Sequence, residues 1–463
     1  MIRFVVSGMS RVAGPLICLI LIVSTSYSGI RTEKYAYARY AEKVKEEFLH
    51  AWNNYKEFAW GHDELKPLSR SYRDWYKESL LMTPVDAYDT MVLMGLKDEA
   101  REDKDLILSR LSFKKDMEVQ AFEITIRELG GLLSAYELDH DRRFLDLATD
   151  LANRLLPIFT SPTGMPYRYV NLTTGVTRDS ISNPAEIGSL TLEFGTLSKL
   201  THNPIYYSKA KRAVKALFSR RSKIGLVGTW INVKTGEWTD RDSHVGGSID
   251  SYYEYLLKAS ILFRDRDFRK MWGASITAVN KFLPDTVGNE LWYGHVNMDT
   301  GVREGTEFGA LDAFFPAVLA LGGDIVRAKK LDESCYKMWL YYGVEPEDID
   351  FTTMKVTSPY YGLRPENIES NYYLYHYTRD PEYRFRAETY FRMLEYYCRT
   401  ENGYATLSDV RTRAKLDEMP SYFLAETLKY LYLTFAPASV LGFDKIIFNT
   451  EGHPLRKQLP RVR

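Results

Sequence analysis

The stretch YELDHDRRFLDLA, residues 136–148, joins two helical segments through a short polar turn. An apolar helix leads into the turn, and the aromatic side chain of Phe144 opens the second helix. The same signature recurs with Tyr206 in KLTHNPIYYSKA, with Phe268 in LFRDRDFRKMW and with Tyr383 in YHYTRDPEYRFRA. The first three aromatics stand 62 residues apart, at 144, 206 and 268. A period of about 60 residues indicates a helical hairpin followed by a long loop.

A further copy of this hairpin, LALGGDIVRAKKL around Val326, fits between the third and fourth aromatics. Seven segments are apolar on most faces, which is typical of the buried first helices of such hairpins. They begin near Asp86, Glu123, Glu186, Asp250, Leu311, Glu366 and Tyr422. Amphipathic partners such as DRRFLDLATDLANRLLPIF suit an outer layer, and the opening helix from Tyr35 to Phe58 supplies its seventh member. The pattern predicts an all-α fold, an (α/α)7 barrel or toroid of seven inner and seven outer helices. It would be a single catalytic domain over residues 33–456, with a tail at 457–463.

The charge balance of the chain argues against a polyanionic partner. The 463 residues contain 61 Lys and Arg and 61 Asp and Glu. Removing residues 1–28, which hold Arg3 and Arg11 and no acid, leaves 59 basic residues against 61 acidic ones. Domains that bind nucleic acid usually carry a basic excess, so no nucleic-acid partner is expected. The 14% aromatic content suits a large core or a site that stacks sugar rings.

The first 28 residues have the pattern of a secretory signal peptide. Two arginines and the uncharged run VAGPLICLILIV (residues 12–23) precede small residues, and cleavage is expected after Ser26 or Ser28. An uncleaved anchor is the alternative; after cleavage no stable membrane association is expected. Export would take the protein to the periplasm or medium of a bacterium, or to the ER or secretory-pathway lumen of a eukaryote.

Two cysteines remain after the predicted cleavage, Cys335 and Cys398, because Cys18 lies in the signal. They are expected to be buried free thiols, and a disulfide between them is the alternative in an exported protein. No Cys and His cluster has zinc spacing and the eight histidines are scattered, so a catalytic zinc is not expected.

Four acids, Glu123, Glu186, Asp250 and Glu366, fall at or near the starts of inner helices. In an up-and-down toroid those starts share one end of the barrel, so the carboxylates are expected to converge on one mouth. An alternative explanation is that acids favour the first turn of any helix, where they complement the helix dipole.

Further acids interrupt largely apolar stretches, at Glu193, Glu369 and Glu426. Buried carboxylates are costly unless they are paired, and Arg127 lies one turn after Glu123 on the same helix face. An acid-rich pocket with fixed arginines and aromatics is what a glycosidase needs, because one carboxyl protonates the leaving oxygen while another activates water. A purely structural network of ion pairs is the alternative.

The sequence resembles glycoside hydrolase family 47, the class I α-mannosidases, from about Tyr40 to Leu455. Eight ordered motifs carry the resemblance: HAWNNYKEFAWGHDEL, VDAYDTMVLMGL, FEITIRELGGLLSAY, EIGSLTLEFGTLSKLT, DSYYEYLLK, LRPENIES, SYFLAETLKYLYLTF and FNTEGHPL. LSFKKDMEVQAFE, GTWINVKTGEWTDRDS, LDAFFPAVLALGGD and GYATLSDV make it most similar to the ER degradation-enhancing mannosidase-like group.

The resemblance implies an inverting exo-α-1,2-mannosidase that trims high-mannose N-glycans or related mannosides. It also implies an (α/α)7 barrel whose C-terminal segment plugs one end, with a calcium ion at the base of the pocket. The expected partner is a mannose-containing oligosaccharide or glycoprotein, and the protein is expected to be a monomer.

The resemblance assigns roles to residues that match the family motifs. Glu123 matches the acid that protonates the leaving group through a water, and Asp250 matches a second acid to which that task is sometimes assigned. Glu366 matches the general base, and Thr450 matches the calcium ligand. Residues that match those lining the sugar or ordering calcium-bound waters are Arg127, Glu186, Arg364, Glu369, Tyr422 and Glu426.

Four positions depart from the commoner family pattern. Ser248 replaces an arginine, Ala310 a histidine and Pro420 a glutamate, which puts linkage and branch preference in doubt. Ala313 replaces a cysteine whose usual partner matches Cys335. The alternative function is a lectin-like protein of the degradation-enhancing type, which would bind glycans in the same pocket with little or no hydrolysis.

Overall fold

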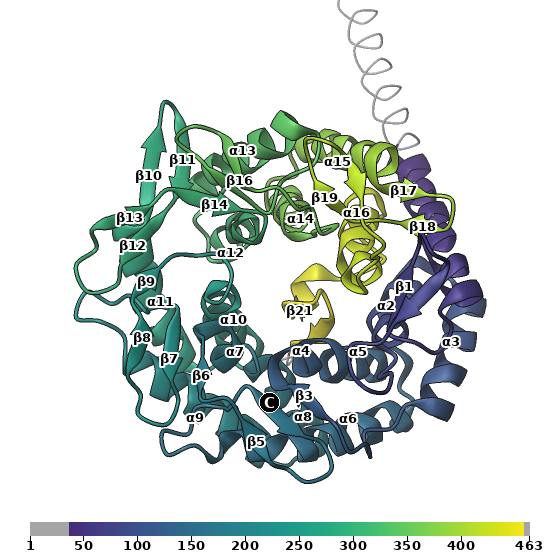
Figure 1. The fold of residues 1–463 in the computed structure, drawn as a ribbon, viewed down its shortest axis with the longest axis horizontal. Helices are drawn as coiled ribbons and strands as arrows, with labels where there is room; N and C mark the ends of the chain where they lie inside the picture. The colour runs from purple at the N-terminus through teal and green to yellow at the C-terminus, as the bar shows by residue number, and fades with distance from the viewer. Residues whose placement is uncertain (1–36, 458–463) are drawn as a thin grey trace, which may run out of the picture.

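The computed structural model describes residues 37–457, whose helices form a closed ring of two layers (Figure 1). The predicted signal peptide, residues 1–28, and positions 458–463 of the predicted tail lie outside the described residues. Within the described range, no helix has the length and apolar character that crossing a membrane requires.

The ring has the predicted seven inner and seven outer positions within the described range. The inner layer consists of α2 (Met82–Met94), α4–η1–α5 (Ala121–Ile124, Thr125–Leu129, Gly130–Asp139), α7–α8 (Pro184–Gly188, Thr191–Thr201), α10 (Asp250–Leu262), η3–α12 (Leu311–Phe314, Phe315–Leu321), α14 (Glu366–Thr378) and η4–α16 (Phe423–Thr427, Leu428–Phe435). The outer layer consists of the helix over residues 37–58, α3 (Lys97–Arg110), α6 (Arg142–Leu155) with η2 (Leu156–Thr160), α9 (Ile205–Phe218), α11 (Arg266–Phe282), α13 (Ile325–Tyr342) and α15 (Glu382–Cys398). The (α/α)7 architecture is therefore confirmed.

The polar residue of each repeated turn caps the outer helix that follows it. The side chains of Asp141, Asp265 and Asp324 accept hydrogen bonds from backbone N–H groups in the first turns of α6, α11 and α13. Asn203 and Asp380 accept in the same way from the first residues of α9 and α15. Because the first N–H groups of a helix have no partner within it, an Asp or Asn at this position starts the helix at a defined residue.

The repeated aromatics are core residues that lock the two layers together. The buried members are Phe144, Tyr206, Phe268 and Tyr383, each three residues after its cap. The copy around Val326 forms the predicted hairpin, with Asp324 as the cap of α13, but it has no aromatic residue at the corresponding position. Val326 is 71% exposed, and the position three residues after the cap is Arg327, which bonds to Asp324 and to the Tyr293 hydroxyl. A charged side chain with two polar partners cannot fill the core position of a ring.

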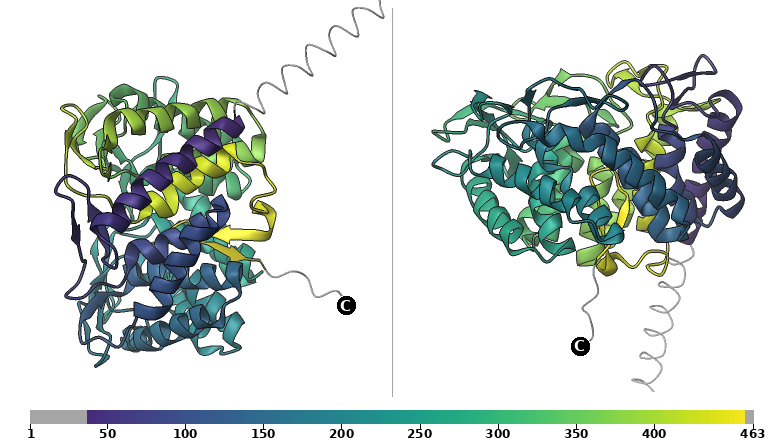
Figure 2. Two further views of the ribbon diagram at one scale, coloured as in Figure 1. Left: turned by 90° about the vertical axis from the view of Figure 1, so that its right-hand side faces the viewer. Right: turned by 90° about the horizontal axis from the view of Figure 1, so that it is seen from below.

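The helix over residues 37–58 and α16 meet and close the ring. Figure 2 shows the helix over residues 37–58 lying along α16. The rings of Tyr37 and Tyr40 stack on Phe435, with centroids 6.3 and 5.3 Å apart. The opening helix is thus the predicted seventh outer member.

Short antiparallel strands occupy the segments that the sequence predicts as loops. At one end of the barrel lie β1 (Glu64–Lys66), β2 (Ser71–Arg73), β3 (Glu118–Gln120), β4 (Tyr169–Asn171), β5 (Thr177–Arg178), β6 (Ile181–Ser182), β7 (Trp230–Asn232), β8 (Trp238–Asp240), β9 (Asp242–Ser243), β10 (Pro284–Val287), β11 (Glu290–Tyr293), β12 (His295–Asn297), β13 (Arg303–Gly305), β14 (Glu307–Gly309), β15 (Asp348–Asp350), β16 (Lys355–Ser358), β17 (Arg399–Thr400), β18 (Gly403–Tyr404), β19 (Leu407–Asp409) and β20 (Ala414–Lys415). They form two- and three-stranded sheets around the mouth. Strands of two to four residues are too short to leave a clear alternation of apolar and polar residues in the sequence.

The last hairpin enters the barrel from the opposite end. After η5 (Phe443–Lys445), β21 (Ile446–Phe448) pairs with β22 (Pro454–Arg456). Figures 1 and 2 show this hairpin inside the ring, pointing towards the mouth that carries the other strands. The turn over residues 449–453 therefore forms the floor of the barrel.

Candidate active site

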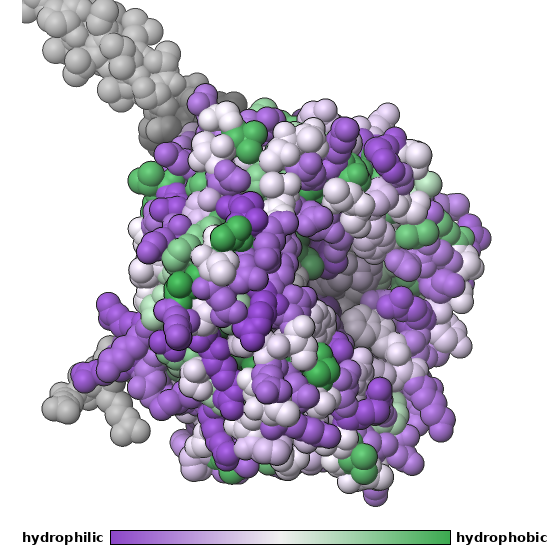
Figure 3. Space-filling view, turned by 60° about the vertical axis from the view of Figure 1, so that its left-hand side comes forward, coloured by the Kyte–Doolittle hydropathy of each residue, from purple (hydrophilic) through white to green (hydrophobic). Residues whose placement is uncertain are grey.

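A cavity of about 330 Å³ opens at the mouth of the barrel, where the space-filling surface is hollowed (Figure 3). It lies between the first turns of inner helices and the turn of the C-terminal hairpin. All the predicted site residues line it: Glu123, Arg127, Glu186, Asp250, Arg364, Glu366, Glu369, Tyr422, Glu426 and Thr450. The apolar side chains on the face around the hollow are scattered rather than gathered in a patch.

The helix starts bring the predicted acids together. Glu123 is the third residue of α4, Glu186 the third of α7, and Asp250 and Glu366 are the first residues of α10 and α14. Because inner helices run in the same direction around the ring, these first turns share the mouth. The predicted convergence is present.

Two inner helices widen into π-helical turns beside the cavity. Arg127 lies in η1 and Glu426 lies in η4. A π turn inserts an extra residue into a helix, which displaces side chains from the regular spacing, and such turns often occur at functional sites. The spacing of residues in the sequence does not reveal them.

Two carboxyls that line the cavity, Glu123 and Asp250, have different surroundings. Glu123 accepts a hydrogen bond from Nε of Arg127 at 3.0 Å. Burial and the nearby charge of Glu254 raise the pKa of Asp250 to about 7, although the Ser251 N–H and hydroxyl donate to its Oδ1. Asp250 can therefore hold a proton near neutrality.

Glu366 also lines the cavity, near the charge of Arg364. Burial, reinforced by Glu347 and Glu369, raises its pKa to about 8 against the attraction of Arg364. Its Oε2 is a buried atom with no hydrogen-bond partner. Arg364 is held by Glu347, to which it donates from Nε at 3.1 Å and also from its terminal nitrogen.

Tyr422 separates the two arginines of the site. Its ring lies 5.6 Å from the guanidinium carbon of Arg127 and 5.8 Å from that of Arg364. Its hydroxyl donates to the carbonyl of Gly362 at 2.7 Å. The ring is thereby fixed as one wall of the cavity.

Glu186 is tied to the rim rather than to the floor. Arg168 donates to its two oxygens at 2.7 and 2.8 Å, Ser182 donates at 3.1 Å and Gln120 at 2.9 Å. Asn183 caps α7 by accepting from the Glu186 N–H. These four hydrogen bonds hold the Glu186 carboxylate in place at the rim.

The floor of the cavity is a set of metal-ligating oxygen atoms around Thr450. Burial raises the pKa of Glu369 and Glu451, to about 7 and about 8, and raises that of Glu426 strongly. Carboxyls in this cluster raise one another's pKa, because adjacent negative charges repel. A divalent cation reverses that cost, and hydroxyl and carboxylate oxygens are the ligands that calcium prefers. The residues present therefore fit a calcium ion.

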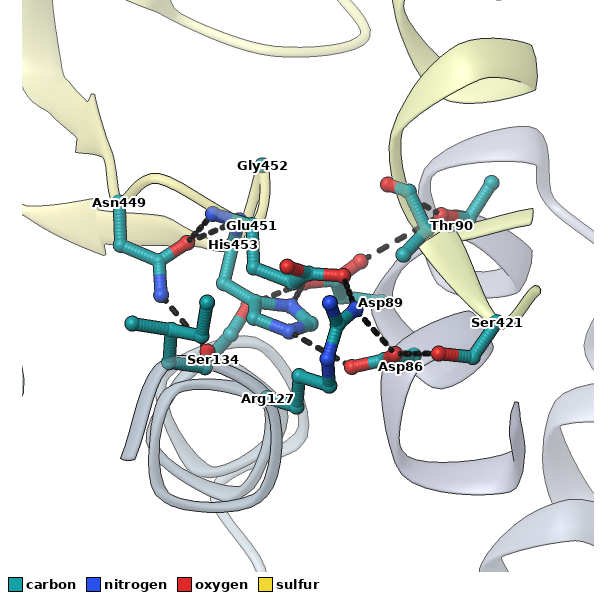
Figure 4. Close-up of polar contacts among 12 residues, drawn as sticks. Asp86, Asp89, Thr90, Arg127, Ser134, Ser421, Asn449, Glu451, Gly452 and His453 are labelled. Carbon is teal, nitrogen blue, oxygen red and sulfur yellow. Dashed lines mark hydrogen bonds and ion pairs between the residues drawn. The ribbon is translucent and has the colours of Figure 1, made fainter. Parts of the chain in front are cut away.

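A buried ion network underlies this floor and fixes the turn that carries Thr450 (Figure 4). His453 contacts Asp89 at 2.7 Å and Asp86 at 3.4 Å, and Lys429 contacts Asp89 at 2.6 Å. Burial opposes charge on the imidazole, but the attraction of Asp89 and hydrogen bonds with Asp86 and Asp89 outweigh it and raise the pKa of His453 to about 9. The network joins α2 and α16 to the C-terminal turn.

Arg127 connects the network to the cavity. It bonds to Glu451 and lies 3.5 Å from Asp86, in addition to its contact with Glu123. Sequence reasoning did not single out Glu451, Asp86 or His453 individually, although they lie in the motifs VDAYDTMVLMGL and FNTEGHPL. Their partners are far apart in sequence, so only the motifs themselves could have pointed to them.

The departures from the family pattern fall mostly outside the cavity. Ser248 lines it, with a left-handed φ of 76° and its carbonyl accepting from the Ala185 N–H at 2.9 Å. Ala310 is buried, and it does not line this cavity. Cys335 and Cys398 are free and buried, in agreement with the expectation of unpaired thiols.

The helical ring and its acid-lined cavity place the chain among the (α/α)-barrel proteins. Comparison with models of protein families identifies the family within this class. The model of glycosyl hydrolase family 47 matches residues 47–457, and the chain belongs to this family.

The similarity to individual relatives supports this family assignment. Alpha-mannosidase I MNS4 of Arabidopsis thaliana is 39% identical, with 91% of this chain and 70% of the relative covered. ER degradation-enhancing alpha-mannosidase-like protein 2 of Mus musculus is 35% identical over 95% of this chain and 82% of its own. The solved alpha-1,2-mannosidase from Trichoderma reesei superposes with a TM-score of 0.83 at 30% identity, over 91% of this chain and 99% of that one. A D-mannose isomerase, at a TM-score of 0.55 and 14% identity over 69% and 87% of the two chains, shares the fold alone.

Proposed function

We propose that the protein is a calcium-dependent exo-α-1,2-mannosidase that hydrolyses terminal α-linked mannose with inversion, from high-mannose N-glycans or related mannosides. The observation that carries the proposal is the convergence of Asp250, Glu123 and Glu366 on one cavity. Inverting hydrolysis needs an acid and a base on opposite sides of the sugar, with room for a water beside the base.

The chain's own groups have distinct tasks in this mechanism. Glu366 accepts the proton of the attacking water as a carboxylate. Arg364 and bound calcium would stabilise this charged form against the burial that raises the pKa of Glu366 to about 8. Glu123, through a water, or Asp250 delivers a proton to the leaving oxygen. The raised pKa of Asp250 suits that delivery, because a general acid must hold its proton near the working pH.

Thr450 would hold calcium, together with waters positioned by Glu369, Glu426 and Glu451. Bound calcium supplies a positive charge that grips the hydroxyls of a mannose and lowers the pKa of the surrounding groups. The ion pairs of Arg127 keep this floor in place, and the ring of Tyr422 offers a face to the sugar.

A second candidate function is glycan binding with little or no hydrolysis. Ser248 motivates it, because a serine lines the cavity where the commoner family pattern has an arginine. The similarity to ER degradation-enhancing alpha-mannosidase-like protein 2 points in the same direction.

The test is a panel of linkage-defined mannose disaccharides followed by proton NMR. We expect hydrolysis of the α-1,2-linked disaccharide in the presence of Ca²⁺, with β-mannose as the first product. α-Mannose as the first product contradicts inversion. Binding of the disaccharide without any product establishes the lectin-like function instead.

We further propose that residues 33–456 act as one catalytic domain in a monomeric, exported protein. A mannose-containing oligosaccharide or glycoprotein is the partner. Size-exclusion chromatography with light scattering, on protein purified from the exporting host, tests the monomer, and N-terminal sequencing tests cleavage after Ser26 or Ser28.

A further inference from the structure

Three side chains with metal-ligating atoms meet on the rim of the mouth, outside the cavity described above. Asp242 is the first residue of β9, His244 is the first residue after the end of β9, and His295 is the first residue of β12. One imidazole nitrogen of each histidine and one carboxylate oxygen of Asp242 all lie within 4.8 Å of one another. Within the described part of the chain, no other group of three His, Cys, Asp or Glu meets this criterion.

The strand register explains why they meet. β12 pairs antiparallel with β9, with Val296 opposite Ser243 and Asn297 opposite Asp242. The same register brings His295 opposite His244, and alternate residues of a strand share a face. The two imidazoles accordingly stack, with centroids 4.3 Å apart and planes 17° from parallel. Figure 1 shows β9 and β12 side by side at the edge of the ring.

One ring nitrogen of His244 faces Asp242. Nε2 of His244 lies 4.0 Å from Oδ2 of Asp242 and contacts the Thr229 hydroxyl at 3.2 Å. That hydroxyl donates to the carbonyl of Asp242 at 2.8 Å, which ties the segment around His244 to Thr229.

Two buried polar atoms in this cluster have no hydrogen-bond partner. Nδ1 of His244 and Oδ1 of Asp242 are both buried atoms without a hydrogen-bond partner, and His244 as a whole is 7% exposed. An unpartnered buried polar atom is costly, and native proteins usually satisfy it with a protein group, a water or an ion. Oδ2 of Asp242, in contrast, bonds to Nδ1 of His295 at 2.6 Å.

We propose that Asp242, His244 and His295 bind a divalent transition-metal ion, of the zinc or cobalt type, on the rim of the mouth. Two imidazoles and one carboxylate are a donor set that zinc takes readily, whereas calcium prefers oxygen ligands alone. Tetrahedral ligand atoms at about 2.1 Å from an ion lie about 3.4 Å from one another. Nε2 of His244, 4.0 Å from Oδ2 of Asp242, therefore has to move closer, Nδ1 of His295, 2.6 Å from Oδ2, has to move away, and the stacked rings have to tilt.

The ion would anchor the segment that leads to the active site. Only residues 245–249 separate His244 from the first residue of α10, and the N–H of that residue, Asp250, donates to the carbonyl of Gly246 at 2.9 Å. A fixed His244 thus limits the movement of the loop that carries Ser248. The role is positional and does not depend on whether the protein hydrolyses mannosides.

The test is titration of the full-length protein with Co²⁺ in excess Ca²⁺, followed by visible absorption spectroscopy and displacement by Zn²⁺. We expect one equivalent of Co²⁺ with the absorption of a nitrogen-ligated ion. His295→Gln and Asp242→Asn should weaken the affinity more than about tenfold, since even the loss of an outer-shell partner costs that much. The matched control is His62→Gln, because His62 also pairs with an aspartate, Asp74, at 3.0 Å, but has no second histidine.

Thermal unfolding gives a second readout that is independent of the spectrum. Zn²⁺ should raise the unfolding midpoint of the wild type and of His62→Gln and leave that of His295→Gln unchanged. The side chain of His295 is 20% exposed, so its replacement should permit folding. Equal Co²⁺ affinity in the wild type and in His295→Gln would overturn the proposal and leave an Asp–His ion pair without a metal. So would the absence of binding in the wild type.

Discussion

The buried ion network under the cavity floor and the rim cluster both join histidine to aspartate, yet they differ in how completely their polar atoms are satisfied. In the ion network, Asp89 pairs with both Lys429 and His453, and none of their side-chain nitrogen and oxygen atoms lacks a partner. In the rim cluster, two buried polar atoms have no partner. The difference indicates that the ion network is a self-sufficient framework, whereas the rim has unused ligating capacity.

The cavity lies between these extremes and depends on what it binds. Its carboxyls repel one another, since burial, and then the charges of Glu451, Glu369 and Glu366, raise the pKa of Glu426. The cavity, which depends on a bound ligand, should therefore respond more strongly to a change than the buried ion network or the exposed ion pairs.

The largest effect is expected on removing calcium. A chelator should abolish hydrolysis of an α-1,2-linked mannobiose, and Ca²⁺ added alone should restore it, because the floor supplies only oxygen ligands. The measurement is the rate of mannose release before and after Ca²⁺ is returned. Restoration by Zn²⁺ alone would show that the rim, and not the floor, controls activity.

The next largest effect is expected for Glu366→Gln. Loss of the general base should lower the hydrolysis rate at least about 100-fold, while the affinity for the disaccharide changes little. Rates are measured by mannose release and affinity by calorimetry. Near-normal turnover would contradict the assignment of the base.

The variant His453→Gln tests whether the buried ion network under the cavity floor stabilises the fold. Removing one partner from a buried ion network leaves uncompensated charge on Asp86 and Asp89, which should lower the free energy of unfolding by about 3–5 kcal/mol. Chemical denaturation measures this change. His62→Gln is the control, because the side chain of His62 is 32% exposed and its pairing with Asp74 should contribute far less.

The pH dependence of stability distinguishes the two variants further. The pKa of His453 is raised from 6.5 to about 9, so its stabilisation is complete below the ordinary pKa and is lost as the pH rises through about 9. The stability difference between wild type and His453→Gln should therefore shrink between about pH 6.5 and 9. A difference that is constant over this range would show that His453 is not charged in the fold.

The smallest effect is expected on the outer face. Lys337 bonds to Glu290 at 2.6 Å, but their side chains are 45% and 30% exposed. Lys337→Gln should change the free energy of unfolding by less than about 1 kcal/mol and leave hydrolysis unchanged, because water screens such pairs. A loss comparable with that of His453→Gln would erase the contrast between buried and exposed ion pairs.

Much of the fold was predictable from local signals. The capping Asp or Asn and the buried aromatic three residues later are short-range features, so the hairpins and their order followed from the sequence. The copy around Val326 keeps the cap at Asp324 without the aromatic, and it still forms the predicted hairpin. The mouth strands escaped prediction because each is held by its neighbour rather than by its own residue pattern.

The candidate site was predictable where position on a helix was enough. Glu123, Asp250 and Glu366 lie at the starts of inner helices. They therefore had to converge once these helices formed a ring. The pairing of Arg364 with Glu347, 17 residues earlier, and the partners of His453, more than 360 residues away, could not be inferred from spacing.

By itself, the sequence determined the helical hairpins, their number and the end of the barrel at which the acids gather, because caps, apolar faces and helix direction are local properties. Only the tertiary structure decided which charges meet. Arg127 reaches Glu451 across 324 residues, and His295 reaches Asp242 across 53, because closure of the ring and pairing of β9 with β12 bring them into contact. Electrostatic and metal-ligating properties depend on distances of a few ångströms, and those distances exist only in the closed fold.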